Sequence, residues 1–296
     1  MPGASAITTV LRGAVDLHCH SGPNPFPRRF DHAEAAFDAE RLEMRAILVK
    51  SHHHNTVMDL LAMGDRLAKS STQVFGGIAL NSQVGGINPY AVAMSLRMGG
   101  KAVWFPTFSS GRHIECHPEG GGFPTATVDV PTARVDVHND AGELLPEVYE
   151  VLDLIAESNA ILSGGHLPPE TITQLFEEGR RRGVKRMVIN HPNFVIGAKP
   201  EQCLELVRLG AYVEHEVGMY DPEGYRKWDP KDLLTWIETI GPEHTVLASD
   251  LGQANRPLPV DAFIRVGSAL LDLGLSEKDL RQITCVNPAG LLGLDD

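Results

Sequence analysis

The segment Val15-Asp16-Leu17-His18-Cys19-His20 joins an apolar, strand-like run to two histidines that stand two residues apart. Because successive side chains of a strand point to opposite faces, His18 and His20 share one face and Cys19 points away from it. Two imidazoles at the end of a strand can bind one metal ion from a rigid base, although this spacing alone also arises by chance. The segment therefore predicts a strand that ends in half of a metal site.

Seven further β-branched or aliphatic runs follow at intervals that suit a strand, a loop and a helix. They are Ala46–Ser51, Val74–Leu80, Ala102–Phe108, Ile161–His166, Arg186–His191, Ala211–Val217 and Thr245–Asp250. Apolar residues at helical spacing, such as Val148, Leu152 and Ile155, predict crossover helices between them. Eight parallel strands with such helices predict a single α/β domain, a (β/α)8 TIM barrel over residues 1–296. An open doubly wound sheet is the alternative, but no GxGxxG motif follows the first run.

The chain is longest between the fourth and fifth runs, whose starts are 59 residues apart. This interval exceeds its neighbours by about 30 residues, which predicts an insertion at residues 109–142. The insertion holds a triple glycine and two alternating pieces, 126–130 and 133–138, that predict a hairpin. Loops after barrel strands lie on the catalytic face, so we interpret the insertion as a lid, with a disordered surface loop as the alternative.

Composition and charge narrow the class of protein. The formal charge is −12 and the largest basic cluster is Arg180-Arg181-Arg182, so we expect no nucleic-acid partner. We expect no membrane association either, since no apolar run is long enough for a span and the first fifteen residues do not resemble a secretory signal. The four cysteines stand far apart without a CxxC pair, which indicates reduced thiols. We expect a cytoplasmic homo-oligomer that acts on a small molecule.

Polar residues end three of the later runs, and this placement is the main functional signal. His166 ends the fifth run, His191 the sixth and Asp250 the eighth. The carboxyl ends of parallel barrel strands meet on one rim, where barrel enzymes carry out their chemistry. A buried structural histidine explains any one of these positions, but five such residues on one rim favour a metal site.

This pattern resembles the amidohydrolase superfamily of metal-dependent hydrolases, whose barrels carry HxH on strand one, His on strands five and six, and Asp on strand eight. The closing stretch Asn287–Leu294 is also similar to the C-terminal segment of many members, and the chain looks closest to an uncharacterised branch. The resemblance implies that His191 is either a ligand or a polariser of the substrate carbonyl. It implies four further metal ligands: His18, His20, His166 and Asp250.

One departure from the family pattern concerns a second metal. Binuclear members bridge their metals with a carboxylated Lys or a Glu at the end of strand four, and the run Val103–Phe108 offers neither. Lys101 lies at the opposite end of that strand. Lys50, near the end of the second run, is the candidate for another bridge, because a lysine beside a cation needs a lowered pKa or carboxylation. The alternatives are a neutral or substrate-binding amine and a lysine that extends to solvent.

Candidate substrate contacts lie in the loops after the first two runs. Arg28 and Arg29 could meet an anionic substrate, with a surface role as the alternative. The triplet His52-His53-His54 cannot face one pocket entirely, and we expect His52 and His53 to contact the substrate.

Two further groups of residues are weaker candidates. Glu214 and Glu216 share one face of the seventh strand, where they either support the metal ligands or are structural. His113, Cys116 and His117 lie in the insertion, and their spacing matches no metal motif strongly.

Imidazoles and a carboxylate together suit Zn2+, with Mn2+ or Fe2+ as alternatives. We predict one such ion, and a second that depends on Lys50. The leading hypothesis is hydrolysis of a small amide, imide or lactone by hydroxide formed at the metal, with Asp250 as general base and acid and His191 or the metal stabilising the oxyanion. The rivals are a metal-dependent decarboxylase of an aromatic or unsaturated acid, a phosphoesterase, and a non-catalytic metal-binding barrel.

Overall fold

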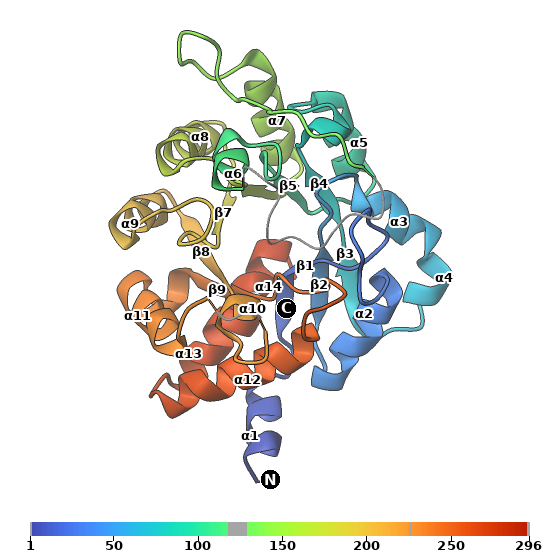
Figure 1. Cartoon of the computed structure of the whole chain (residues 1–296), viewed down its shortest axis with the longest axis vertical. Helices are drawn as coiled ribbons and strands as arrows, with labels where there is room; N and C mark the ends of the chain where they lie inside the picture. Colours follow the sequence, from blue (N-terminus) through green and yellow to red (C-terminus); the bar gives the residue numbers. More distant parts are fainter. Residues whose placement is uncertain (1, 118–128, 225–226, 295–296) are drawn as a thin grey trace.

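A computed structural model of the chain describes residues 2–117, 129–224 and 227–294 (Figure 1). Each run predicted to be a strand is present. The strands are β1 (Val15–Cys19), β2 (Ala46–Val49), β3 (Gln73–Phe75), β4 (Gly77–Ala79), β5 (Ala102–Trp104), β6 (Ile161–Ser163), β7 (Arg186–Asn190), β8 (Ala211–Glu216) and β9 (Thr245–Ala248). The third predicted strand is divided into β3 and β4 around Gly76. A β-carbon at Gly77 would lie 2.3 Å from the Ala102 carbonyl oxygen, so only glycine lets β4 approach β5 this closely.

All pairs of neighbouring strands are parallel, in the orders β1-β2-β3 and β4-β5-β6-β7-β8-β9. Gly76 connects the two groups, and its carbonyl accepts a hydrogen bond from the Lys101 amide at 2.8 Å. At the other edge, the Asp250 amide donates to the His18 carbonyl at 2.8 Å, which joins β9 to β1. The strands therefore follow one another around a ring with the long helices outside it, and the (β/α)8 barrel is confirmed (Figure 1).

The helices surround the strands. They are α1 (Pro2–Leu11), α2 (His32–Ala39), η1 (Glu40–Leu42), α3 (Thr56–Ala62), α4 (Gly64–Leu67), η2 (Ser82–Val84), α5 (Pro89–Arg97), α6 (Gly111–Cys116), α7 (Pro146–Glu157), α8 (Pro169–Arg181), α9 (Pro200–Arg208), α10 (Val217–Tyr220), α11 (Pro230–Ile240), η3 (Pro242–His244), α12 (Pro259–Asp272), α13 (Glu277–Arg281), η4 (Gln282–Val286) and α14 (Asn287–Leu292). Their starts are encoded locally: Asp229 caps α11 and is followed by Pro230 at the first helical position. The predicted stripe of Val148, Leu152 and Ile155 is buried on α7. No described helix has the length and apolar character that crossing a bilayer requires.

The inner part of the hydrophobic core fills the barrel. Inside the barrel, small and branched strand residues such as Val15, Leu48 and Val246 pack together with Ala289 and Leu292 of α14. The side-chain amide of Asn287 donates to the carbonyls of Pro242 and Thr245, at the start of β9. Helix α14 therefore covers the amino ends of the strands, and the carboxyl ends are left for the polar residues.

The predicted insertion after the fourth strand contains α6 and an irregular segment. Residues 118–128 lie outside the described part of the chain, and with them most of the first predicted hairpin piece, 126–130. The second piece, 133–138, forms no strand, and its one bridge joins His138 to Leu144. Within the described residues the predicted hairpin is therefore wrong, because alternation alone does not supply a pairing partner.

Candidate metal centre

The candidate ligands lie at or just beyond the carboxyl ends of the strands. His18 is in β1 and His20 follows it, His191 follows β7, and Asp250 comes two residues after β9. His191 and Asp250 have positive φ angles of 29° and 52°, a left-handed conformation that is unfavourable for residues other than glycine. Such backbone strain persists where the surrounding structure enforces it, and it is frequent at functional sites.

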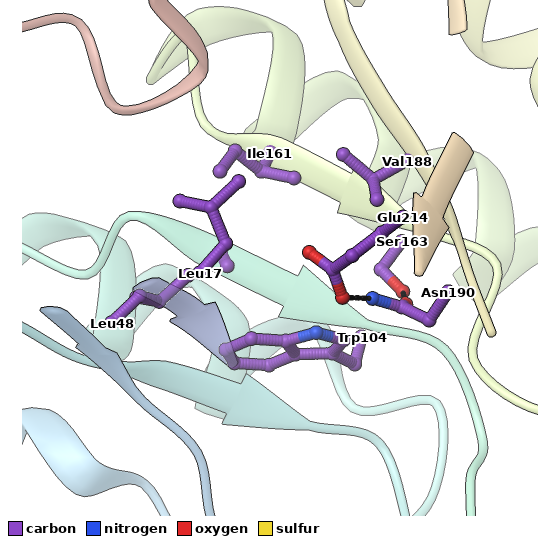
Figure 2. Close-up of a pocket in the computed structure, with 9 residues that line it drawn as sticks. Leu17, Leu48, Trp104, Ile161, Ser163, Val188, Asn190 and Glu214 are labelled. Atoms are coloured by element: carbon purple, nitrogen blue, oxygen red, sulfur yellow. Dashed lines mark hydrogen bonds between the residues drawn. The ribbon is translucent and has the colours of Figure 1, made fainter. Parts of the chain in front are cut away.

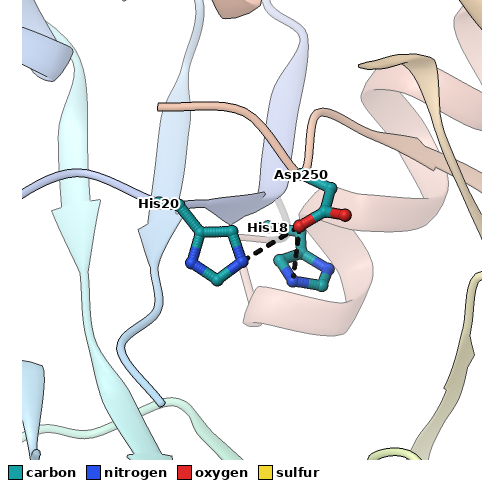
Figure 3. A group of neighbouring side chains, drawn as sticks. All are labelled: His18, His20 and Asp250. Atoms are coloured by element: carbon teal, nitrogen blue, oxygen red, sulfur yellow. Dashed lines mark ion pairs between the residues drawn. The ribbon is translucent and has the colours of Figure 1, made fainter. Parts of the chain in front are cut away.

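His18, His20 and Asp250 converge on one point (Figure 3). Asp250 Oδ1 lies 3.0 Å from His20 Nε2 and 3.5 Å from His18 Nε2. The Nδ1 atom of His20 is 3.1 Å from the Lys50 carbonyl oxygen, so Nδ1 carries the proton. Burial lowers the pKa of His20 to about 3, which keeps the ring neutral. The Nε2 lone pair thus faces a carboxylate oxygen with no proton between them, an arrangement that a cation would satisfy.

His18 is also held through its Nδ1 atom, in this case by two glutamate side chains. Its Nδ1 lies 3.0 Å from Glu214 Oε1 and 3.1 Å from Glu216 Oε1, which leaves Nε2 directed toward Asp250. A carboxylate behind a histidine orients the ring and raises its basicity as a metal ligand. The residues present therefore fit a divalent ion, and the two glutamates, whose role was open from the sequence, are the groups that anchor His18.

A buried chain of hydrogen bonds continues below Glu214 (Figure 2). The Ser163 hydroxyl donates to the side-chain oxygen Oδ1 of Asn190, and the side-chain Nδ2 of Asn190 donates to Glu214 Oε1. Burial raises the pKa of Glu216 well above its usual range, and the Glu214 charge raises it further. Burial acts the same way on Glu214, but hydrogen bonds, above all from His18, outweigh it and lower the pKa of that carboxyl. One carboxylate and one carboxylic acid therefore support His18.

Lys50 points into the site and not to solvent. Its side chain is 1% exposed, and Nζ lies 3.0 Å from His18 Nε2 and 5.4 Å from the centre of the Trp104 ring. Burial lowers the pKa of Lys50 to about 8, although Asp250, Glu214 and Glu216 oppose this shift. The alternative of a solvent-exposed lysine is therefore wrong.

His166 and His191 lie on the same rim but are not part of the tight cluster. The ring centres of His166 and His191 are 5.0 Å apart, and those of His18 and His191 are 5.9 Å apart. Among the described residues, the groups whose ligand atoms all lie close together are His18-His20-Asp250 and His18-Glu214-Glu216. Burial lowers the pKa of His191 to about 4, and its buried Nδ1 has no hydrogen-bond partner in the described part of the chain. A metal-ligand role for these two residues stays a prediction.

The candidate substrate contacts divide into inner and outer residues. The His52 ring stacks on His20 at 5.0 Å and on Phe108 at 4.0 Å, which places it beside the metal ligands. His53 lies next to Phe26, with ring centres 5.2 Å apart.

Two of the neighbouring residues turn away from the site. His54 bonds to Asp59 at 2.6 Å, and the exposed Arg29 donates to the Arg256 carbonyl. Arg28 remains half-buried near Asp250, whose charge acts on its guanidinium.

The structure adds His113, which its sequence spacing did not distinguish. His113 Nδ1 lies 2.8 Å from His166 Nδ1, and the rings stack with centres 4.9 Å apart. Ser110, the residue that caps α6, also donates from its hydroxyl to the His166 carbonyl. The only signal in the sequence is the capping serine three residues before His113, and it predicts a helix start but not this contact. The insertion is thus attached directly to a candidate metal ligand.

Comparison with known proteins identifies a matching family and several solved structures with the same fold. A family described as of unknown function, DUF6282, matches residues 13–214. No curated protein matches the sequence significantly.

Three solved structures illustrate the shared fold. An amidohydrolase from Pseudomonas aeruginosa is 11% identical, with a TM-score of 0.63 and coverage of 98% of both chains. The phosphotriesterase homology protein from Escherichia coli, complexed with phosphate, is 13% identical, with a TM-score of 0.56 and coverage of 95% of this chain and 98% of that one. A 2,6-dihydroxybenzoate decarboxylase is 11% identical, with a TM-score of 0.55 and coverage of 96% of this chain and 100% of that one. These are amidohydrolase-superfamily structures, so the resemblance is confirmed at the level of the fold.

Proposed function

The chain belongs to DUF6282, a family of unknown function, and we propose that it is a metal-dependent hydrolase of a small amide, imide or lactone. One observation carries the proposal. The neutral His20 directs its Nε2 lone pair at the Asp250 carboxylate from 3.0 Å, and His18 directs its own Nε2 to the same oxygen. Burial and the Lys50 charge would lower the pKa of His18, but Glu216, Asp250 and Glu214 raise it to about 10, so His18 carries a proton that a bound cation would displace. Once His18 Nε2 is deprotonated, three acceptors face one point and form a site for a cation.

His18, His20 and Asp250 would hold the ion, with His166 as a further ligand on the rim and His191 as either a ligand or the group that polarises the substrate carbonyl. Two imidazoles and a carboxylate suit Zn2+, and Mn2+ or Fe2+ are compatible with the same donors. A bound divalent ion lowers the pKa of a coordinated water to about 7 and polarises a substrate carbonyl. A second ion would need a bridge, for which a carboxylated Lys50 is the candidate.

Side chains of the protein would carry out the proton transfer and the binding of the substrate carbonyl. Burial would raise the pKa of Asp250, but the charge of His18 outweighs it and lowers that pKa, so Asp250 is ionised. Asp250 therefore acts as the base that accepts a proton from the attacking water and then delivers it to the leaving nitrogen or oxygen. If His191 is not a metal ligand, its neutral ring, whose Nδ1 has no partner among the described residues, would bind the substrate carbonyl oxygen as it gains charge.

A metal-dependent decarboxylase of an aromatic or unsaturated acid is the second candidate. The observation that favours it is the Arg28 guanidinium near Asp250, because a decarboxylase must bind a carboxylate beside its metal. Release of carbon dioxide from aromatic acids, without cleavage of amides or lactones, would identify this activity.

The metal assignment is tested by His18→Ala and His20→Ala, with His138→Ala as a control. His138 is a half-buried histidine that bonds to Gln174 and belongs to neither group of close ligand atoms among the described residues. We expect elemental analysis to show loss of bound metal in the first two variants and full metal content in the third. Full metal occupancy together with turnover in His18→Ala would overturn the assignment.

The state of Lys50 has a separate test. Crystals grown at high bicarbonate should show a carbamate on Nζ and a second anomalous peak if Lys50 bridges two ions. A plain amine beside a single ion would establish the mononuclear site.

A further inference from the structure

Arg28 is held beside the candidate metal centre without a partner for its charge. The loop after β1 is fixed there by an antiparallel bridge between Arg28 and Gln253, three residues after Asp250. The Arg28 guanidinium forms no ion pair with any described residue, and its Nε is buried without a hydrogen-bond partner. Asp250 is the carboxylate whose charge reaches it, and that carboxylate is already engaged by His18 and His20. Arg28 is half-buried, and its buried Nε, which has no hydrogen-bond partner among the described residues, would be satisfied by a ligand that accepts from it.

A second unpartnered nitrogen lies in the same region. The Nδ1 atom of His53 is buried and has no hydrogen-bond partner among the described residues. Burial lowers the pKa of His53 to about 4, and the charge of Arg28 lowers it further, so the ring is neutral and within electrostatic reach of the guanidinium. A guanidinium and a neutral imidazole supply N–H donors that suit one carboxylate.

Two aromatic side chains, Phe26 and Phe108, contact the ring of His53. The Phe26 ring lies 5.2 Å from His53 and 5.8 Å from Phe108, with an edge-on arrangement toward Phe108. Both phenylalanines are partly buried, and Phe108 also stacks on His52 beside the metal ligands. Half-buried aromatic rings around His53, together with the Arg28 guanidinium whose charge reaches that ring, favour a ligand with a planar apolar body and an anionic end.

We propose that Arg28 and His53 form a carboxylate subsite, and that the substrate carries this carboxylate on an aromatic or unsaturated ring that packs against Phe26. The inference rests on the proposed function and specifies its substrate class. A single guanidinium with a neutral imidazole suits a monoanionic carboxylate better than a phosphate dianion, which calls for more positive charge.

Benzoate and its neutral isostere benzamide are the probes that test the subsite. Binding is measured by isothermal titration calorimetry on the full chain, both zinc-loaded and metal-stripped, so that coordination to the ion is separated from binding to Arg28. The test variant is Arg28→Gln, and the matched control is Arg29→Gln, which removes the same charge one residue away. The Arg29 side chain is exposed and bonds only to the Arg256 carbonyl among the described residues. Arg28→Lys keeps the charge but loses the planar fork.

We expect Arg28→Gln to weaken benzoate binding by about 30-fold or more in both metal states, because one partner of a desolvated ion pair is lost. Arg29→Gln should change it by less than about 2-fold, and benzamide binding should not distinguish the variants. If Arg28→Gln does not fold, Arg28→Lys should still weaken benzoate by about 5-fold or more.

The subsite is refuted if Arg28→Gln and Arg29→Gln have equal effects, or if benzamide binds the unmodified protein as tightly as benzoate. Failure of the metal-dependent function has a different signature. Elemental analysis would then find no metal under any condition, while titration of the metal-stripped protein would still decide whether Arg28 binds the carboxylate.

Discussion

Replacing His113 with phenylalanine isolates the hydrogen bond by which α6 holds His166. The phenyl ring keeps the stacking on Phe108 and on His166, at centre distances of 4.7 and 4.9 Å, but removes the nitrogen that lies 2.8 Å from His166 Nδ1. His166 is then left with a buried ring nitrogen whose partner is lost, at a cost of about 1–3 kcal/mol.

Loss of this hydrogen bond should mainly weaken the binding of the metal ion. A histidine ligand needs its second nitrogen bonded, so that the tautomer and the ring orientation suit the ion, and loss of such a partner lowers metal affinity by about 10- to 100-fold. That range corresponds to about 1.4–2.7 kcal/mol, in agreement with the cost of the unpaired nitrogen. We therefore expect His113→Phe to bind zinc about 10- to 100-fold more weakly than the unmodified protein.

Zinc affinity is measured by competition with a chromophoric chelator, and folding is monitored in parallel by circular dichroism. The matched control is Ile114→Ala, which alters the neighbouring, exposed residue of the same short helix. A folded His113→Phe variant with zinc affinity within about 2-fold of the unmodified protein would refute the reasoning. Equal losses in both variants would show that α6 acts through its packing and not through the hydrogen bond.

Two further predictions concern stability. Burial would raise the pKa of Asp59, but its hydrogen bonds to His32 and His54 lower it to about 2, below the usual value of 3.8. Asp59 should therefore stabilise the fold above about pH 4 and lose this contribution as the pH falls toward 2. In urea denaturation between pH 2 and 5, Asp59→Asn should remove about 1 kcal/mol of the pH-dependent part of the free energy of unfolding. The same pH dependence in the variant and the unmodified protein would contradict this. Arg265 donates two hydrogen bonds to the fully buried Asp221, at 2.7 and 2.6 Å. Arg265→Ala should lower the free energy of unfolding by about 3 kcal/mol, and Arg265→Lys by less; equal stability of all three proteins would show that the pair contributes nothing.

The strands were predictable because their signal is local. Barrel strands are buried on both faces, so each appears in the sequence as a short run such as Ile161–Ser163 or Thr245–Ala248 between polar residues. The break between β3 and β4 was not predictable, since it depends on how closely Gly77 approaches Ala102 of another strand. The failed hairpin at 133–138 has the same origin, because a strand needs a partner and not only an alternating pattern.

The candidate site was predictable in its residue types and their order along the chain. A polar residue at the end of an apolar run stands out, and parallel topology brings such residues to one rim. His18, His20 and Asp250 meet there as expected. A sequence pattern holds no information on which atoms face one another, so it left open whether Lys50 points inward and what Glu214 contacts.

By itself, the amino-acid sequence determined the barrel and the rim on which the histidines gather, and it predicted a metal site there, because these follow from the periodicity of strands and from the ends of buried runs. Only the tertiary structure decided that two glutamates anchor His18, that Lys50 is buried against the ligands and that α6 contacts His166. It also decided that the Arg28 Nε has no hydrogen-bond partner among the described residues. These contacts join segments far apart in the chain, and their geometry depends on how the loops pack at the rim. Local sequence preferences do not specify that packing.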